Sequence, residues 1–371
     1  YGGNNYGQKS YGQNNYGQND YGKNSYGQND YGNNGYGARY ASVAASSENA
    51  GQQDESVDLG SELFGKNNNK IGKGKKEESS ELEGMETVYE GKSYEVYLLD
   101  EDQLKLQLTL DVRLQEVAVK EISKQVKAWN AKKGVVIVMD IDTGELLALA
   151  STPSYDPNRY WDYSPSLFKE WSVQELFEPG STFKPINLAL ALEEGVISPN
   201  GEVNDDGRIT VGGWPLSNWD LRPNGVLTFP EVLQVSSNVG MIKIMKKLNA
   251  SNYWQWLRRL GIDEIPETDL PGAVGGQIKS KQIFVNHPIE PAVASFGQGF
   301  SITPLKLAQL HALIANGGKL VTPHITKGLK GDYESYFNTP SVSKQVLSPE
   351  VTNTVLGWME TVVSFYDESG I

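Results

Sequence analysis

Two residues near the middle of the chain have the types and spacing needed for covalent catalysis. Ser181 and Lys184 follow a Pro-Gly pair and open an apolar, helix-patterned run that ends near Glu194. Residues three apart share one helical face, so the Lys184 amine can approach the Ser181 hydroxyl across one turn. A serine hydroxyl is a weak nucleophile that needs a base, and a lysine can serve when its neutral form is favoured. The spacing predicts a serine nucleophile with a lysine base, although an N-capping serine and a solvated lysine fit it as well.

A second motif, Ser236-Ser237-Asn238, lies between two helix-patterned runs. Thr228 to Glu231 has the spacing of a capping box with Pro in the first turn, which indicates the start of the first run. A hydroxyl and an amide at a helix–helix junction can relay a proton through Ser236 and can hold a substrate carbonyl or a lysine through Asn238. Taken alone, Ser-Ser-Asn also fits an ordinary helix cap.

Composition and charge exclude several classes of protein. The net charge of -13 argues against a nucleic-acid binder, and the absence of Cys excludes disulfides, thiolate catalysis and Cys-ligated zinc. The three histidines, His287, His311 and His324, lack nearby carboxylates at metal-ligand spacing, so we predict no metal and no cofactor. A Ser-His-Asp triad is possible but unsupported, and we expect the histidines to be structural or surface residues. No run of eighteen apolar residues occurs and the first residue is Tyr, so we expect a piece of a longer chain without a visible anchor.

The chain divides into three regions by composition. Residues 1–40 repeat Tyr-Gly every five residues among polar residues, which predicts a disordered tail, or alternatively a self-associating or wall-contacting segment. Residues 41–93 stay polar and carry runs of Lys and Glu, as is typical of a solvated linker. Residues 94–371 have the patterns of a folded domain, whose structure should begin between Tyr94 and Leu104.

Hydrophobic periodicity in the third region predicts both strands and helices. Leucines alternate with polar residues from Leu104 to Leu110, the period of a half-buried strand, and Asp111 is placed to cap a helix that runs to about Ala131. The other expected elements are a buried strand at Val135–Met139, its hairpin partner at Leu146–Ala150, and helices at Val239–Leu248, Pro304–Asn316 and Glu350–Val363. Strands come first and no clear strand follows the helices, so we predict an α+β domain whose C-terminal strands are missing.

The two motifs occur in the order found in penicillin-binding proteins, Ser-x-x-Lys and then Ser-x-Asn. Four further segments resemble that family: Gly134–Glu145, Pro153–Asn158, Ser295–Leu305 and Ala315–Gly318. The resemblance covers roughly Leu104 to Leu356 and is strongest to class B enzymes of the division type. It implies the penicillin-binding/β-lactamase-like transpeptidase fold, an antiparallel sheet with helices.

The resemblance also implies an activity, a set of roles and a place in the cell. Ser181 would attack the penultimate D-Ala carbonyl of a peptidoglycan stem peptide, with Lys184 and Ser236 moving protons and Asn238 positioning the substrate amide. An amine of a second stem peptide would then form the cross-link, and β-lactams would acylate the same serine. Family members work at the extracytoplasmic (periplasmic) face of the cell membrane, so we expect cell-division membrane proteins as further partners.

The sequence departs from the family in two places. No Lys-Thr-Gly or Lys-Ser-Gly follows Ser236, so the expected site lacks substrate-carboxylate recognition and one oxyanion donor, and we expect this chain to be weak or inactive by itself. The Tyr-Gly repeat stands where an anchor and a pedestal domain are expected. Two alternatives stay open: a scaffold of the same fold that recruits division partners without turnover, and a serine β-lactamase or β-lactam sensor. The latter leaves Pro153–Asn158 and Ser295–Gly299 unexplained.

Overall fold

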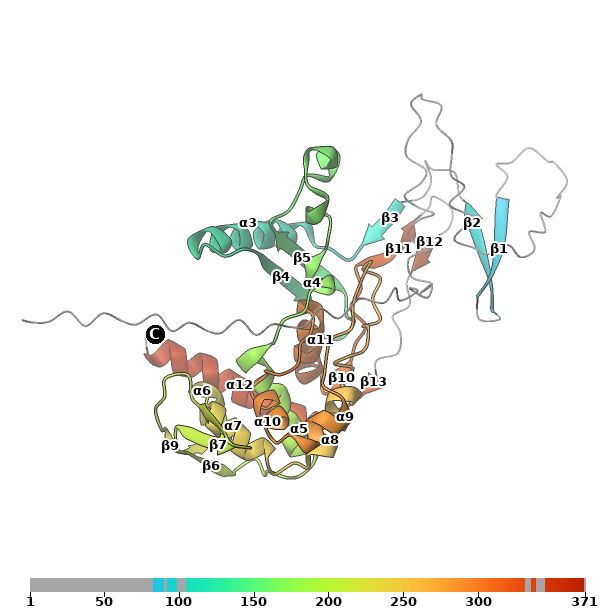
Figure 1. The fold of residues 1–371 in the computed structure, drawn as a ribbon. Helices are drawn as coiled ribbons and strands as arrows, with labels where there is room; N and C mark the ends of the chain where they lie inside the picture. The colour runs from blue at the N-terminus through green and yellow to red at the C-terminus, as the bar shows by residue number, and fades with distance from the viewer. Residues whose placement is uncertain (1–82, 90–91, 99–104, 331–334, 338–343, 370–371) are drawn as a thin grey trace, which may run out of the picture.

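The computed structural model describes residues 83–89, 92–98, 105–330, 335–337 and 344–369 (Figure 1). The strands are β1 (Glu83–Tyr89), β2 (Lys92–Leu98), β3 (Lys105–Leu108), β4 (Gly134–Met139), β5 (Leu146–Thr152), β6 (Glu202–Asp205), β7 (Arg208–Val211), β8 (Trp214–Ser217), β9 (Gly225–Thr228), β10 (Lys319–Leu320), β11 (Thr326–Lys330), β12 (Ser335–Phe337) and β13 (Lys344–Gln345). The α-helices are α3 (Val112–Ala128), α4 (Trp171–Gln174), α5 (Lys184–Glu193), α6 (Phe229–Gln234), α7 (Asn238–Met245), α8 (Ala250–Arg259), α9 (Lys281–Asn286), α10 (Ile289–Ala294), α11 (Pro304–Ala315) and α12 (Pro349–Ser369). Short 3-10 helices are η1 (Pro157–Asp162), η2 (Pro165–Leu167) and η3 (Gly180–Phe183).

One helix and one hairpin form a layer of their own, at the top of Figure 1. The Asp111 carboxylate accepts hydrogen bonds from the backbone N–H groups of Arg113 (2.9 Å) and Leu114 (3.4 Å), which confirms the predicted cap of α3. α3 lies across the antiparallel pair β4–β5, where Ala118 packs on alanines of β5. The predicted hairpin is confirmed, but its first strand is half-buried rather than buried, because within the described ranges β4 is an edge strand that pairs only with β5.

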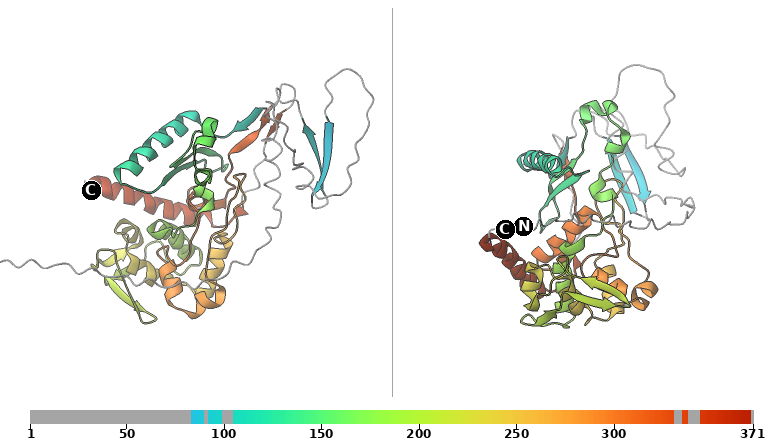
Figure 2. Two further views of the ribbon diagram at one scale, coloured as in Figure 1. Left: turned by 45° about the horizontal axis from the view of Figure 1, so that its top comes forward. Right: turned by 60° about the vertical axis from the view of Figure 1, so that its left-hand side comes forward.

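The larger part of the protein is a cluster of helices around α5. From Lys184 to Ala191 every residue of α5 is buried, because α6, α7, α11 and α12 all pack against it. In both views of Figure 2, α12 runs along one side of this cluster, where Trp358 contacts Phe229 of α6. The predicted capping box of α6 is confirmed, since the Glu231 carboxylate accepts a hydrogen bond from the Thr228 N–H at 2.7 Å.

Two sequence-based expectations about strands were wrong. The leucines of β3 are exposed rather than half-buried, Leu106 by 45% and Leu108 by 41%, because β3 pairs only edge to edge with β11. Several strands also follow the first helices: β6 pairs with β9, β7 with β8, β10 with β13, and β11 with both β3 and β12. Each has two to five residues, too few to display the alternating pattern by which strands are recognised.

The N-terminal regions are described only in part. β1 and β2 form an antiparallel hairpin that the sequence patterns did not predict, and it overlaps the end of the region assigned to the linker. The predicted disordered tail and the rest of that linker, residues 1–82, lie outside the described residues. Across the described ranges, no helix is both long and apolar enough to cross a membrane.

A buried chain of polar contacts ties three helices of the cluster together. The Tyr253 hydroxyl of α8 donates to the Asn187 side-chain oxygen of α5 at 2.9 Å, and both residues are fully buried. The Asn187 amide in turn donates to the backbone carbonyls of Ala294 and Ser295 at 3.0 and 2.9 Å. Each group that Asn187 offers therefore has a partner, and α5 is held in register with the segment after α10.

Replacing Tyr253 by Phe should destabilise the protein by about 1 to 2 kcal/mol, because the Asn187 oxygen would stay buried without a donor. Urea unfolding followed by far-UV circular dichroism measures this difference. Tyr160→Phe is the matched control, since Tyr160 is 48% exposed and its hydroxyl has no hydrogen bond among the described residues. Equal midpoints for the two variants would contradict the role given to the buried contact.

Candidate active site

The turn that carries Ser181 is clamped from a distant part of the chain. Ser181 lies in the 3-10 turn η3, so the predicted helix begins with a tighter turn and becomes α-helical only at Lys184. The Gly180 N–H donates to the carbonyl of Gly297 at 2.8 Å, and the Gly299 N–H donates to the Glu178 carboxylate at 2.9 Å. A Cβ on Gly297 would lie 2.0 Å from the Gly180 oxygen. Only glycine therefore permits this close approach, which leaves the Ser181 side chain exposed.

The Lys184 amine forms hydrogen bonds with Ser236 and Asn238 of the second motif. It is 1% exposed, and it donates three hydrogen bonds, to the Ser236 carbonyl (2.6 Å), the Ser236 hydroxyl (3.0 Å) and the Asn238 side-chain oxygen (2.8 Å). An ammonium has three donors, so this set satisfies it completely. The structure thus brings together three of the four predicted site residues, from segments more than fifty positions apart in sequence.

The fourth predicted residue, Ser181, lies one turn before Lys184, and its carbonyl accepts the Lys184 N–H. Among the described residues, no hydrogen bond joins the Ser181 hydroxyl to Lys184, Ser236 or Asn238. Catalytic hydrogen bonds are often loose before substrate binds, so this geometry agrees with a resting site. The Ser236 hydroxyl, which accepts from the amine, can pass on a proton of its own.

The backbone of Ser236 takes a conformation that is rare for a residue with a side chain. Its φ of +53° lies in the left-handed region, which costs about 1 kcal/mol for a residue other than glycine. This turn ends α6 and sets both the carbonyl and the hydroxyl of Ser236 against the amine. The predicted helix–helix junction is confirmed, and its strained residue is one that contacts the candidate base.

Burial changes the acid–base behaviour of the lysine. Desolvation lowers the pKa of the Lys184 amine from its ordinary value to about 7, against an opposing effect of the Asp205 charge. A substantial fraction of the amine is therefore neutral at neutral pH. A neutral amine has a lone pair and can act as a general base beside a serine hydroxyl.

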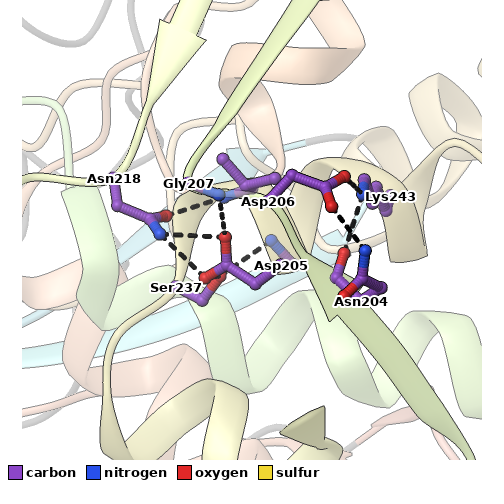
Figure 3. A network of polar contacts seen from close by, with 9 residues as sticks. Asn204, Asp205, Asp206, Gly207, Asn218, Ser237 and Lys243 are labelled. Atoms are coloured by element: carbon purple, nitrogen blue, oxygen red, sulfur yellow. Dashed lines mark hydrogen bonds and ion pairs between the residues drawn. The ribbon is translucent and has the colours of Figure 1, made fainter. Parts of the chain in front are cut away.

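A buried carboxylate that the sequence patterns missed supports the second motif (Figure 3). Asp205 is fully buried and accepts a hydrogen bond from the Ser237 hydroxyl at 2.7 Å. Asn218 donates to Asp205 through its amide (2.7 Å) and accepts from the backbone N–H of Asn238 (3.0 Å) through its oxygen. The only sequence signal was the polar run Asn204–Gly207, which has the composition of an ordinary turn.

The histidines have structural contacts. His311 of α11 lies against the turn that carries Ser181, with its Nε2 atom 3.0 Å from the carbonyl of Thr182, and burial lowers the pKa of His311. His287 and His324 each contact a nearby backbone carbonyl through Nδ1. Within the described ranges, no group of three or more His, Asp or Glu side chains is placed to hold a metal ion.

Comparisons with known proteins identify similar proteins of one family. The family model of the penicillin binding protein transpeptidase domain matches residues 134–367. A peptidoglycan D,D-transpeptidase FtsI homolog of Chlorokybus atmophyticus is 44% identical over 62% of this chain and 36% of its own length. A homolog of the same name from Mesostigma viride is 39% identical over 72% of this chain and 48% of its own length. The chain thus spans less than half the length of these relatives.

Solved structures give the same result. Penicillin-binding protein 3 of Mycobacterium tuberculosis, solved with aztreonam, is 26% identical, covers 70% of this chain and 58% of its own, and superposes with a TM-score of 0.65. A peptidoglycan glycosyltransferase of Burkholderia ambifaria is 29% identical, covers 69% of this chain and 74% of its own, and has a TM-score of 0.59. Both likenesses support the α+β fold expected from the sequence.

Replacing Gly297 by Ala should displace the turn that carries Ser181 and destabilise the protein. The φ of +80° at this position already disfavours a side chain, and the added Cβ would meet the Gly180 oxygen. Gly213→Ala is the matched control, because Gly213 has a φ of +87° but no atom within 4 Å of the added Cβ. Urea unfolding should show Gly297→Ala to be less stable than the control by about 1 to 3 kcal/mol. A difference near zero would contradict the tight contact between the two segments.

Proposed function

The chain belongs to the penicillin-binding protein transpeptidase family, and we propose that it is a serine D,D-transpeptidase that cross-links the stem peptides of peptidoglycan. The observation that carries this proposal is the buried Lys184 amine, which has a pKa of about 7 and is bound to Ser236 and Asn238 one turn from Ser181. The names of the relatives support the same reaction class. D-Ala-D-Ala stem peptides are the proposed substrates, and β-lactams the proposed inhibitors.

Acylation uses Ser181, Lys184 and Ser236 in distinct roles. The Ser181 oxygen attacks the penultimate D-Ala carbonyl carbon, while its proton passes to the neutral Lys184 amine, directly or through the Ser236 hydroxyl. Backbone N–H groups at the start of the η3–α5 segment favour the negative charge that forms on the carbonyl oxygen. The C–N bond then breaks, the proton is returned to the departing D-Ala amine, and an ester on Ser181 remains.

Deacylation reverses the proton path. The amino group of a second stem peptide attacks the ester carbonyl, Lys184 accepts one proton from that amine, and Ser181 recovers its proton as the new amide forms. The Asn238 amide donates to the carbonyl of Ser217 at 3.2 Å, and a substrate amide could take the place of that partner. We further propose that the protein works at the extracytoplasmic face of a cell membrane with cell-division membrane proteins, as the resemblance to division-type enzymes suggests.

Labelling with a fluorescent penicillin tests the assignment. We expect a covalent label on the chain that disappears in Ser181→Ala and falls by at least about a hundredfold in Lys184→Met, the usual loss when a general base is removed. Lys247→Met, at an exposed lysine of the segment after α7, should label like the parent chain. A gene product that also carries a Lys-Thr-Gly or Lys-Ser-Gly strand should label faster, because that strand orients the β-lactam carboxylate.

The labelling rate should also depend on pH. Because the neutral amine is the base and the pKa of Lys184 is about 7, the rate should be nearly constant above pH 8 and fall about tenfold per unit below pH 6. Label that survives Ser181→Ala would place the nucleophile elsewhere. Label that forms and is then released by water would favour a β-lactamase, and no label with either gene product would favour a scaffold.

A further inference from the structure

Asp205 is a buried charge that forms no direct ion pair within the described residues. Its carboxylate is fully buried at the end of β6, and no lysine, arginine or histidine forms an ion pair with it among the residues that the structure describes. Donors surround it instead: the backbone N–H of Gly207 (2.8 Å), the amides of Asn218 (2.7 Å) and Asn224 (2.7 Å), and the Ser237 hydroxyl (2.7 Å). Burial alone would raise the pKa of Asp205, but these hydrogen bonds outweigh it and hold the pKa below its ordinary value. The carboxylate is therefore ionised at neutral pH.

Two paths of hydrogen bonds connect this carboxylate to the turn that receives Lys184. In the first, the Ser237 hydroxyl donates to Asp205 and accepts from the Gly240 N–H at 2.8 Å, which closes the first turn of α7. In the second, Asn218 donates to Asp205 and accepts from the backbone of Asn238 at 3.0 Å. Ser237 and Asn238 are both fixed by these paths, and Ser236, with its strained backbone, directly precedes them.

We propose that Asp205 is a positioning residue for the candidate base: its carboxylate holds the Ser236–Asn238 turn in the shape that receives the Lys184 amine, and its negative charge opposes the desolvation of that amine. This inference rests on the proposed function for its catalytic meaning. The positioning of the turn and the effect of the charge on the amine are both inferred from the hydrogen bonds and the burial of Asp205. Asp205 acts on Lys184 through the side chains of Ser237 and Asn218 and does not contact the lysine directly.

Two other ionisable groups among the described residues, His311 and Asp206, do not supply this charge. His311, which contacts the nucleophile turn from α11, is kept neutral by burial. Asp206, the next residue to Asp205, is exposed and forms an ion pair with Lys243 of α7, so its charge is already matched (Figure 3). The charge of Asp205 favours the protonated amine, which is the form that exists after Lys184 has taken the proton of Ser181.

The charge is tested by measuring the pKa of Lys184 directly. Lysine labelled with ¹³C at Cε is followed by NMR over pH 5 to 10, and Lys184→Arg identifies the signal. Asp205→Asn should lower the Lys184 pKa by about 1 unit, since removing a nearby negative charge disfavours the ammonium. Asp206→Asn removes the same charge from the adjacent position and should leave the Lys184 pKa and the labelling rate unchanged.

A second variant covers the case in which Asp205→Asn does not fold. Asn224 is exposed and contacts the same carboxylate, so Asn224→Lys places an ammonium against Asp205 without altering a buried residue. It should lower the Lys184 pKa in the same direction, whereas Asn224→Gln should not. If neither Asp205→Asn nor Asn224→Lys lowers the Lys184 pKa, the electrostatic role is wrong. This measurement requires no reaction at Ser181, so it is independent of the proposed function.

The positioning role is tested by removing the hydrogen bonds of Ser237 while the negative charge of Asp205 is kept. Ser237→Ala removes the link between Asp205 and α7 but leaves the carboxylate ionised. We expect the Lys184 pKa to change by less than about 0.3 unit, a small part of the shift that loss of a charge produces. Penicillin labelling at Ser181 should slow by about tenfold, because the amine is held less well. An unchanged labelling rate in Ser237→Ala would overturn the positioning role.

Discussion

A lysine amine that is taken out of water needs hydrogen-bond acceptors, and within the described part of the chain the Lys184 amine finds them in Ser236 and Asn238. Leaving such a group buried without partners would cost several kcal/mol. The contact between the two motifs is therefore needed for stability, whatever its part in the chemistry. The amine is buried because Lys184 begins α5, which the other helices enclose. Asn238 reaches the amine because it is the first residue of α7. The remaining architecture follows from this pairing: helices enclose α5, and the short strands β6 to β9 close over the start of α7.

The contact between Lys184 and the second motif is accompanied by strained or crowded backbone on both sides. Ser236 adopts a left-handed backbone, and Gly297 approaches Gly180 so closely that no side chain fits. Such conformations persist only where surrounding contacts over-determine them, and here Asp205 and Asn218 supply those contacts on one side. On the other side, Glu178 and Asn187 fix the 294–299 segment. Rigidity at the site therefore comes from polar groups outside the two motifs.

How much of the fold and of the candidate site could be predicted from the sequence depends on how far apart in sequence the contacting residues lie. The cap at Asp111, the capping box at Thr228 and the junction before Asn238 are local patterns, and the structure confirms each of them. The role of Asp205 could not be predicted, because an acidic residue in a polar turn looks solvated until Ser237 is folded onto it. The short strands from β6 onward were missed since two to five residues do not establish a period.

The distant contacts that hold the turn of Ser181 also affect the order in which the protein folds. Asn187 reaches Ser295 across 108 residues, Glu178 reaches Gly299 across 121, and Thr182 reaches His311 across 129. Contacts between such distant positions pay a large loop-closure entropy and form late. On a ribosome, α3 and the β4–β5 hairpin can form as they emerge, whereas the turn of Ser181 must wait until α11 has been synthesised. The turn that carries Ser181 is thereby completed only when most of the domain exists.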